Sequence, residues 1–456
     1  MTAPFLYYMK RFCAAVIAVS MAAMAFLPAV CGAAEKDNVA KTGFGLGVLP
    51  KVGFDADNGM NVGVQLNLNN FKDGKLYPNP YSNTYVDFAW YQKGIINLIL
   101  SHDNRTMIPG ARFCTALQYC HDSSFGFCGL NGYQSNWSPV LPDGSPVGNF
   151  YATDKQIVNF KVDLVGKIMP HLSWEAGYHL IWMDIRDPKG EGDNYLYRLY
   201  GDWGLVPMDM ISGGRSSELR AGIMYDTRDS EATPSRGIWA ETHLIAAPGF
   251  IGSTAPYSRF SFNWRHYVPI YKDRLTLAYR LVWQGFFNED APWYMMPFYT
   301  VCGPQFDRDG MGGFRTLRGI MLNRIQGLQT AIFNTELRWR FIDFRLLNQN
   351  VSLCLSGFFE GGKAVKPYNL DFNALGTATA VPGSKEYEMY SFFVDNSAPD
   401  KFHLSSGGGF RFIFNRNFVI ALELGKALGC TDSRFDNKLQ DGGSKPSFYF
   451  NTGFTF

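Results

Sequence analysis

The segment LSWEAGYHLIW at residues 172–182 alternates apolar side chains with polar or small ones over most of its length. The apolar positions are Leu172, Trp174, Ala176, Tyr178, Leu180 and Trp182, and the positions between them include Ser173, Glu175, Gly177 and His179. A period of two residues is that of a β-strand whose two faces meet different surroundings. One face is apolar enough for lipid and the other carries charge, which predicts a strand of a membrane-spanning barrel.

The same alternation recurs from one end of the chain to the other, for example at 158–164, 275–284 and 448–456. A soluble β-sandwich also alternates, but many of these segments run past ten residues and exceed the usual length of soluble strands. An even number of strands is typical of bacterial barrels. The segments, about sixteen in all, begin near residues 43, 59, 83, 94, 156, 171, 216, 237, 257, 273, 295, 327, 349, 402, 417 and 446.

The connections between these segments differ in length. Some are a few residues long, whereas others span roughly 102–155, 187–215, 302–326 and 365–401. Short turns on one rim and long loops on the other are typical of outer-membrane barrels, with the long loops outside. Aromatic residues make up 16% of the chain, and no apolar run after the first 34 residues is long enough for a membrane helix. We therefore predict an all-β fold, a membrane-spanning antiparallel β-barrel of about sixteen strands over residues 43–456.

Residues 1–34 predict an export signal, with Lys10 and Arg11 before an apolar run and Gly32-Ala33-Ala34 as the cleavage site. A membrane anchor is the competing interpretation, but no positive flank follows the apolar run. Cleavage removes two basic residues and no acid, so the 42 basic and 40 acidic residues become 40 and 40. A neutral mature chain argues against nucleic acid as a partner. Residues 35–42 remain as a short periplasmic segment before the barrel.

The sequence GPQFDRDGMGGFRTLRGIMLNRIQG, residues 303–327, lies between two strand-like segments. It is rich in glycine and carries Arg308, Arg315, Arg318 and Arg324. A connection of this length without its own periodicity is uncommon in a compact domain and is usually functional. A mobile surface loop with basic residues for solubility is the simpler alternative.

Five motifs in order resemble those of the BamA/TamA outer-membrane assembly superfamily. The first is a strand and turn of the form D-x-R-D…P-x-x-G, with Asp226, Arg228, Asp229, Pro234 and Gly237. The signature of the family's long sixth extracellular loop is matched by Gly312, Gly313, Phe314, Leu317, Arg318 and Gly319. The strand motifs N-x-E-L-R and F-x-D-x-G are similar to 334–338 and 358–362. Last, 406–411 resembles the penultimate strands, and the family's C-terminal assembly signal is matched by Phe448, Phe450, Phe454 and Phe456. The similarity covers roughly 213–456.

In this family the loop arginine reaches back inside the barrel to acidic groups on the strands. The resemblance therefore implies that Arg318 is a partner of Glu336 and Glu360, both of which the alternation places on the lumen side. An arginine fork suits this role because it holds carboxylates by paired, charge-assisted hydrogen bonds. The alternative is that all three are separately solvated pore-lining charges. The chain departs from the family at two motif positions, where Ile320 replaces the usual aromatic residue and Glu360 replaces an aspartate. We also expect it to lack the periplasmic POTRA repeats of family members.

No motif of a catalytic, metal or cofactor site stands out, so we expect a protein without enzymatic activity, metal or cofactor. Cys114, Cys120 and Cys128 lie close together in the predicted outer loop 102–155. A disulfide among them is favoured over a zinc site with His121, because their spacing matches no standard metal pair and the bacterial envelope is oxidising.

The first functional hypothesis is an integral barrel of the Gram-negative outer membrane that inserts, assembles or translocates outer-membrane or surface proteins, alone or as an accessory subunit. Its partners would be outer-membrane lipids and other outer-membrane or periplasmic proteins. By resemblance, the mechanism needs a weak seam between the glycine-rich first strand and the last strand, whose exposed edge could template a client strand. The alternatives are a passive or gated solute pore plugged by its own loop, and a structural surface antigen that acts through residues 102–155.

Overall fold

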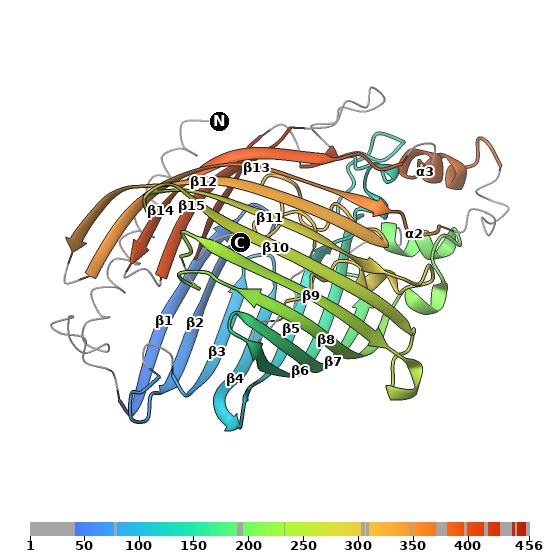
Figure 1. The fold of residues 1–456 in the computed structure, drawn as a ribbon. Helices are drawn as coiled ribbons and strands as arrows, with labels where there is room; N and C mark the ends of the chain where they lie inside the picture. The colour runs from blue at the N-terminus through green and yellow to red at the C-terminus, as the bar shows by residue number, and fades with distance from the viewer. Residues whose placement is uncertain are drawn as a thin grey trace.

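The computed structural model describes residues 42–452, except for 77–79, 189–194, 232, 302–305, 307–309, 347–348, 371–380, 396–398, 415–417, 429–439 and 443–444. The predicted export signal and nearly all of the segment 35–42 lie outside the described residues. Sixteen antiparallel strands form a closed barrel in which each strand pairs with its neighbours in the sequence, and β1 pairs with β16 (Figure 1). The fold class predicted from the sequence is confirmed.

The strands are β1 (Phe44–Asp55), β2 (Gly59–Asn70), β3 (Ser82–Tyr91), β4 (Ile96–Ile108), β5 (Ala111–Gly126), β6 (Ala152–Met169), β7 (Leu172–Arg186), β8 (Gly213–Asp226), β9 (Gly237–Ala247), β10 (Tyr257–Tyr271), β11 (Leu275–Phe286), β12 (Gln329–Leu346), β13 (Gln349–Lys366), β14 (His403–Phe414), β15 (Phe418–Ala427) and β16 (Ser447–Thr452). Two short helices, α2 (Leu196–Asp202) and α3 (Lys385–Phe393), lie in connections. Four 3-10 turns do so too, η1 (Gly132–Gln134), η2 (Met208–Met210), η3 (Gly249–Ile251) and η4 (Trp293–Met295). None of the helices described is long and apolar enough to cross a membrane.

The two rims of the barrel differ in the length of their connections. On the short-turn rim, β4–β5, β6–β7 and β10–β11 are joined by residues 109–110, 170–171 and 272–274. On the long-loop rim, β5–β6, β7–β8, β11–β12 and β13–β14 are joined by 127–151, 187–212, 287–328 and 367–402. β1 begins and β16 ends on the short-turn rim, and the large loops gather at the opposite end.

The two faces of each strand differ in exposure as the alternation predicts. On β7, Trp174 and Trp182 are 36% and 49% exposed on the outer face, whereas Glu175 and His179 are buried on the lumen face. The same division holds for β12, where Leu337 and Trp339 point outward and Glu336 is buried. Apolar side chains outside and polar ones inside are what a lipid-facing barrel requires.

Two predicted segments were wrong, and the errors cancelled in the strand count. The predicted loop 102–155 contains the whole of β5, which pairs with both β4 and β6. Its inward positions mix the small residues Cys114, Ala116 and Cys120 with the charged Arg112 and Asp122, so the alternation was weak. The strand predicted from residue 295 does not exist. That apolar stretch forms η4, and Met295, Phe298 and their neighbours are buried among the loops. A short apolar run fits a buried loop as well as a strand.

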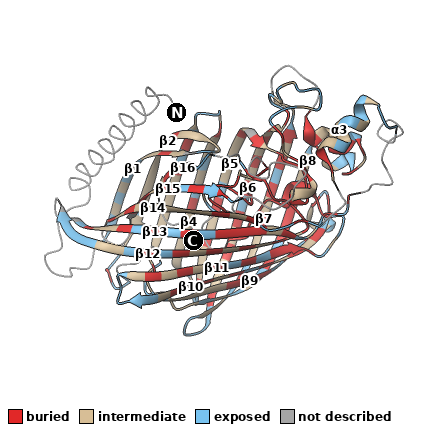
Figure 2. Ribbon diagram, turned by 90° about the horizontal axis from the view of Figure 1, so that it is seen from above, coloured by how far each residue is buried: buried red, intermediate tan, exposed pale blue. Residues whose placement is uncertain are grey.

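The long loops pack into a hydrophobic cap at their rim, where Figure 2 shows a concentration of buried residues. The cap contains side chains from several connections and from the strand ends beneath them. These include Phe127, Phe150, Tyr200, Trp203, Trp293, Met295, Tyr368 and Phe393. Burial of so many large apolar side chains stabilises the loops against one another, so they form one layer over the lumen.

The seam between β1 and β16 has fewer described residue pairs than the other junctions of the barrel. Its described register is the one pair Phe54↔Phe450, whereas β1 pairs with β2 over its whole length from Phe44 to Asp55. The described part of β16 is also short, six residues against eighteen for β12 and β13.

Candidate functional site: the loop inside the barrel

The lumen loop, residues 303–327, places the Arg318 side chain against three glutamates on the barrel wall. Arg318 Nη2 lies 2.5 Å from Glu360 Oε1 and 2.9 Å from Glu336 Oε2. Its Nη1 donates to Glu423 Oε1 at 2.8 Å, and its backbone N–H donates to Glu360 Oε2 at 2.7 Å. The structure thus brings the arginine together with both acids that the sequence paired with it and adds a third. These three glutamates lie on β12, β13 and β15.

Two further arginines complete this ion cluster. Arg411 on β14 donates to Glu336 Oε1 at 2.6 Å and also contacts Glu423, and Arg338 donates to Glu336 Oε1 at 2.6 Å. The cluster therefore contains three guanidinium groups and three carboxylates and is formally neutral. The side chains of Arg318, Arg411 and the three glutamates are wholly buried. Burying single charges here would be costly, and mutual pairing offsets that desolvation.

The Arg318 guanidinium also lies over the ring of Phe358, 3.6 Å from its centroid. Phe358 is on the lumen face of β13, two residues before Glu360, so one strand supplies both the ring and the carboxylate. A guanidinium stacked on a ring and forked onto carboxylates is held in plane and in position. A lysine would keep the charge but could not make this set of contacts.

Glycines let the loop approach the wall this closely. Gly319 has φ of 92°, and a Cβ on it would lie 2.4 Å from the backbone N of Lys426 on β15. Gly425 faces it, and a Cβ there would lie 2.7 Å from the carbonyl carbon of Arg318. Gly312 and Gly313 have φ of 122° and 73°, and a Cβ on Gly312 would lie 1.8 Å from the Met321 oxygen. Gly312 and Gly319 need glycine both for backbone conformation and for space, Gly313 for its backbone conformation, and Gly425 for space.

The loop contacts both strands of the seam. Gly319 N–H donates to Tyr449 Oη on β16 at 2.9 Å, and Phe314 packs on the Tyr449 ring with centroids 5.9 Å apart. On the other side, Leu322 N–H donates at 3.2 Å to Oδ1 of Asp57, in the turn between β1 and β2. The lumen loop therefore bridges the first hairpin and the last strand from inside the barrel.

A second buried group, the outer polar cluster, ties the same loop to the cap. Arg324 donates to the carbonyls of Gln440, Gly132 and Ser135 at 2.5, 3.0 and 2.9 Å. Its Nε is 3.7 Å from Asp441, whose Oδ1 lies 2.6 Å from His403 Nδ1. The sequence motif did not single out Arg324, although its contacts join three long connections.

Asp441 is charged in this cluster. Burial raises the pKa of Asp441, but the ion pair with His403, with help from Arg324 and a hydrogen bond from Tyr133, outweighs burial and holds the pKa below its usual value. The Tyr133 ring also stacks on the His403 ring with centroids 3.7 Å apart. The carboxylate is therefore part of what fixes the loop at the long-loop rim.

Family comparison supplies the identification. The sequence profile of the Omp85 superfamily domain matches residues 132–456, more than half of the chain. The chain belongs to the Omp85 superfamily. Its barrel is similar to that of BamA from Haemophilus ducreyi lacking POTRA domains 1–3, with a TM-score of 0.57 and 14% identity over 91% of this chain and 70% of that one. It is also similar to CdiB from Escherichia coli, with a TM-score of 0.54 and 9% identity over 91% of this chain and 63% of that one. No curated protein sequence matches the chain.

In this Omp85 barrel the predicted strand and turn motif forms the connection between β8 and β9. Arg228 Nη2 donates to Asp226 Oδ2 at 2.7 Å, and Asp229 Oδ1 accepts from the Ser235 N–H at 2.9 Å. Gly237 has φ of 103°, with Thr227 O only 2.3 Å from where its Cβ would be, and Pro234 is buried. The motif residues thus shape a turn on the short-turn rim and do not reach the ion cluster.

The remaining loop residues and the C-terminal signal occupy different places. Leu317 is wholly buried in a hydrophobic cluster with Met311, Ile320 and Ile325 of the same loop. Phe450 packs beside Ile420 at the seam, and the Phe448 ring lies 6.0 Å from that of Phe54. Phe454 and Phe456 lie outside the described residues.

The predicted disulfide is wrong. Cys114 and Cys120 both point inward from β5 and are six residues apart, which is roughly 20 Å along a strand and far beyond disulfide reach. Cys128 follows in the cap, and no disulfide joins it to either. The prediction placed all three in one outer loop, whereas Cys114 and Cys120 lie on β5. Nor is there a group of His, Cys, Asp or Glu that could hold a metal within the described part of the chain.

Sequence reasoning missed Glu423, Arg411 and Tyr449. Glu423 had a usable signal, because it is a lone acid at an inward position of β15 between the outward Leu422 and Leu424. Arg411 was noted within a motif but not assigned a partner. No pattern could have shown that Tyr449 would meet the Gly319 backbone, because that contact depends on where the lumen loop crosses the barrel.

Proposed function

We propose that this Omp85 barrel is a non-enzymatic protein of the Gram-negative outer membrane that takes part in inserting or assembling other outer-membrane proteins. Members of the superfamily act in protein assembly or secretion together with partner proteins. The observation that supports this role most directly is the seam, where a single described pair, Phe54↔Phe450, joins the first and last strands. An edge that opens easily can pair with an extended client strand.

The closed state of the lumen supports exit through the wall rather than along the axis. The lumen loop is held by the ion cluster in the middle of the barrel and by the outer polar cluster at the long-loop rim. The hydrophobic cap covers the same rim. A client that entered from the short-turn rim would find these layers ahead of it and the thin seam beside it.

The first test is depletion of the protein in its own cell. We expect the levels of outer-membrane proteins to fall, measured by quantitative proteomics of the membrane fraction. An outer-membrane proteome that stays unchanged would count against the assembly role. Co-purification from mild detergent tests the accessory-subunit form of the proposal, because such a subunit should bring its complex with it.

A second test locks the seam. Phe54 and Phe450 are paired, and Cα atoms of paired antiparallel residues lie about 4.5–5.5 Å apart, within disulfide range. The double variant F54C/F450C, once oxidised, should fail to replace the wild-type protein in depleted cells and recover on reduction. The matched control is V48C/L66C, which links paired residues of the β1–β2 hairpin on the same outer face. Equal activity of both oxidised variants would show that the seam need not open.

A plugged solute pore is the second candidate, and one observation favours it. A cavity of about 700 Å³ reaches into the barrel from the short-turn rim, so part of the lumen is open to solutes. Planar-bilayer recordings separate the two roles. A stable open conductance for the wild-type protein would favour the pore, whereas closed or brief, irregular currents would favour an assembly barrel.

A further inference from the structure

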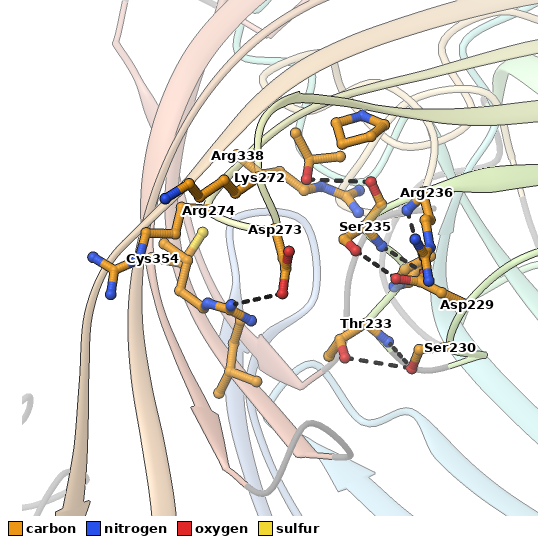
Figure 3. A pocket seen from close by; sticks show the side chains of 15 residues that line it. Asp229, Ser230, Thr233, Ser235, Arg236, Lys272, Asp273, Arg274, Arg338 and Cys354 are labelled. Carbon is orange, nitrogen blue, oxygen red and sulfur yellow. Dashed lines mark hydrogen bonds and ion pairs between the residues drawn. The ribbon is translucent and has the colours of Figure 1, made fainter.

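The cavity on the short-turn rim is a funnel built from five elements and the turns between them. Its outer part is formed by the β8–β9 and β10–β11 connections, where Asp229 and Arg236 face Lys272, Asp273 and Arg274 (Figure 3). Its floor consists of side chains from β11, β12, β13 and β14. These are Thr276, Arg338, Cys354 and Ile413, all of them buried. At about 700 Å³ the cavity has the size of a ligand pocket rather than of a gap between side chains.

The charges around this funnel are mostly positive. Five cations line it, namely Arg236, Lys272, Arg274, Arg338 and Arg340, against the two acids Asp229 and Asp273. Asp229 is engaged within its own turn, where its carboxylate accepts hydrogen bonds from Ser235. Burial raises the pKa of Asp229, but these hydrogen bonds outweigh it and the pKa lies below its usual value, so the group is charged and already satisfied.

Some of the cations are paired and others are not. Arg338 belongs to the ion cluster through Glu336. Arg340 lies 3.3 Å from Asp343 and 4.0 Å from Asp273, and Arg274 is 3.8 Å from Asp343. In the part of the chain that the structure describes, no carboxylate lies within ion-pair distance of Arg236 or Lys272. These two exposed side chains stand on opposite sides of the opening (Figure 3).

We infer that the funnel binds an extended acidic segment of a partner or client polypeptide. The inference rests on the proposed function, which requires a polypeptide to arrive at the short-turn rim. Unpaired cations at the opening raise the local concentration of an anionic chain and orient it. Arg274 and Arg340, whose nearest carboxylates lie 3.3–4.0 Å away, can turn their planar forks toward an incoming carboxylate. The polar wall of Ser230, Thr233, Ser235 and Thr276 can hydrogen-bond a backbone without selecting its sequence.

A lipid phosphate is the competing anion, and the position of the funnel disfavours it. The lining residues come from the lumen face of the strands and from the turns, whereas the apolar outer face carries side chains such as Trp339 and Leu355. A lipid headgroup would have to leave the bilayer surface and bend into the barrel mouth. A soluble polypeptide meets no such obstacle.

The test uses the full-length mature barrel purified in a zwitterionic detergent, with fluorescein-labelled hexaglutamate as the probe and hexalysine as its counterpart. We expect hexaglutamate, but not hexalysine, to raise fluorescence polarisation on binding. The double variant R236E/K272E should weaken binding about tenfold, because two attractions become repulsions at a partly exposed site. Raising the salt concentration should weaken wild-type binding as well, because charges at the opening are screened.

The matched control is Lys167→Glu, which reverses an exposed charge at the end of β6 on the same rim but away from the funnel. It should bind hexaglutamate as the wild type does. A heat-shifted gel band for each variant shows that the barrel is folded. Absence of hexaglutamate binding, equal binding of hexalysine, or equal weakening by K167E would overturn the inference. So would displacement of the peptide by short-chain phosphatidylglycerol at a similar concentration, which would assign the site to lipid.

The two levels of proposal can fail separately. If the barrel does not bind the acidic peptide but depletion still lowers outer-membrane proteins, the assembly role stands. Only the role of the funnel in it is then rejected. Tight, charge-dependent peptide binding in a protein whose depletion changes no outer-membrane protein would remove the assembly role instead.

Discussion

Arg318 joins three strands of the barrel through one side chain. Its guanidinium contacts Glu336, Glu360 and Glu423, and its backbone N–H donates to Glu360 as well. Removing one member of a buried ion cluster leaves the others desolvated and unpaired, which costs more than the pairing itself contributes. The residue fixes the lumen loop to the wall because its three partners lie on β12, β13 and β15.

We therefore expect Arg318→Ala to lower the stability of the folded loop by about 3–5 kcal/mol. Limited trypsin digestion of the purified barrel should cut within residues 303–327 much faster, and Glu360→Ala should behave similarly. The double variant should cost less than the sum of the two, because both remove the same contact. Arg315→Ala is the control, since this arginine is three residues away and exposed. Wild-type protease resistance in R318A and E360A would show that the contact between Arg318 and Glu360 does not hold the loop in place.

The close approach of the lumen loop to β15 at Gly319 and Gly425 gives a second expectation for single residues. Gly319→Ala places a Cβ 2.4 Å from a backbone nitrogen of β15 and strains a left-handed φ, at a cost of at least about 1–2 kcal/mol. Gly425→Ala meets Arg318 from the other side. Gly357→Ala on β13 is the control, because nothing lies within 4 Å of a Cβ there. For each of the three variants, the measurement is the temperature at which half of the compact, folded band is lost on a gel. Equal temperatures for all three would show that the loop and β15 are less closely packed than described.

At the scale of elements, the lumen loop is fixed at two levels, and the outer level contains a carboxylate that responds to acid. The outer polar cluster depends on the charge of Asp441, whose pKa is depressed in the folded protein. Such a group stabilises the fold above its unfolded pKa of about 3.9, and this stability is lost as the pH falls through the lower folded value. Between about pH 5 and pH 7 this carboxylate should cause no change.

We expect Asp441→Asn to be less stable than the wild type at pH 7 by roughly 1–3 kcal/mol, because a charged acceptor of His403 is lost. Between pH 7 and about pH 3 the variant should lose less stability than the wild type, because one depressed carboxylate no longer takes up a proton. Heat-induced unfolding at both pH values measures the difference. Glu386→Gln, on the exposed face of α3, is the control. Identical acid losses in wild type and D441N would contradict the role of Asp441.

The whole molecule is a barrel closed at one end and partly open at the other. The cap, the outer polar cluster and the ion cluster lie in series behind the long-loop rim, and the funnel opens at the short-turn rim. Among the described residues the strands are also uneven in length around the circumference, because β12 and β13 have eighteen residues each whereas β16 has six. On the proposed function, both asymmetries would direct a client toward the seam.

This arrangement predicts little conductance in the intact protein. Replacing residues 310–327 with a short glycine-serine linker should raise single-channel conductance, because the plug is removed while the strands remain. The control is a linker of the same kind in place of the exposed residues 142–144, which lie in the β5–β6 connection. A large steady conductance in the wild type, or no increase after the loop is replaced, would mean that the loop does not block the lumen.

Local pattern was sufficient for most of the barrel. Alternation at β7 or β11 reports which face a side chain takes, so the inward positions of Glu336 and Glu360 could be predicted from their parity alone. It failed at β5, where inward cysteines and alanines gave little contrast, and near residue 295, where apolar residues serve the cap. Near residue 295 the polarity of the sequence was a poor guide because the surroundings are the packed loops of the cap, neither lipid nor water.

The sequence by itself determined that the chain alternates for a barrel, that the connections gather at one rim, and that a basic, glycine-rich loop stands between two strands with inward acids. Only the tertiary structure decided that Arg318 meets Glu423 as well, that Tyr449 and Asp57 hold the loop from both sides of the seam, and that the cysteines stay apart. The physical reason is the separation along the chain of the residues that determine each feature. Strand periodicity is a local property of neighbouring residues, whereas these contacts join residues up to 265 positions apart whose approach depends on the closure of the whole barrel.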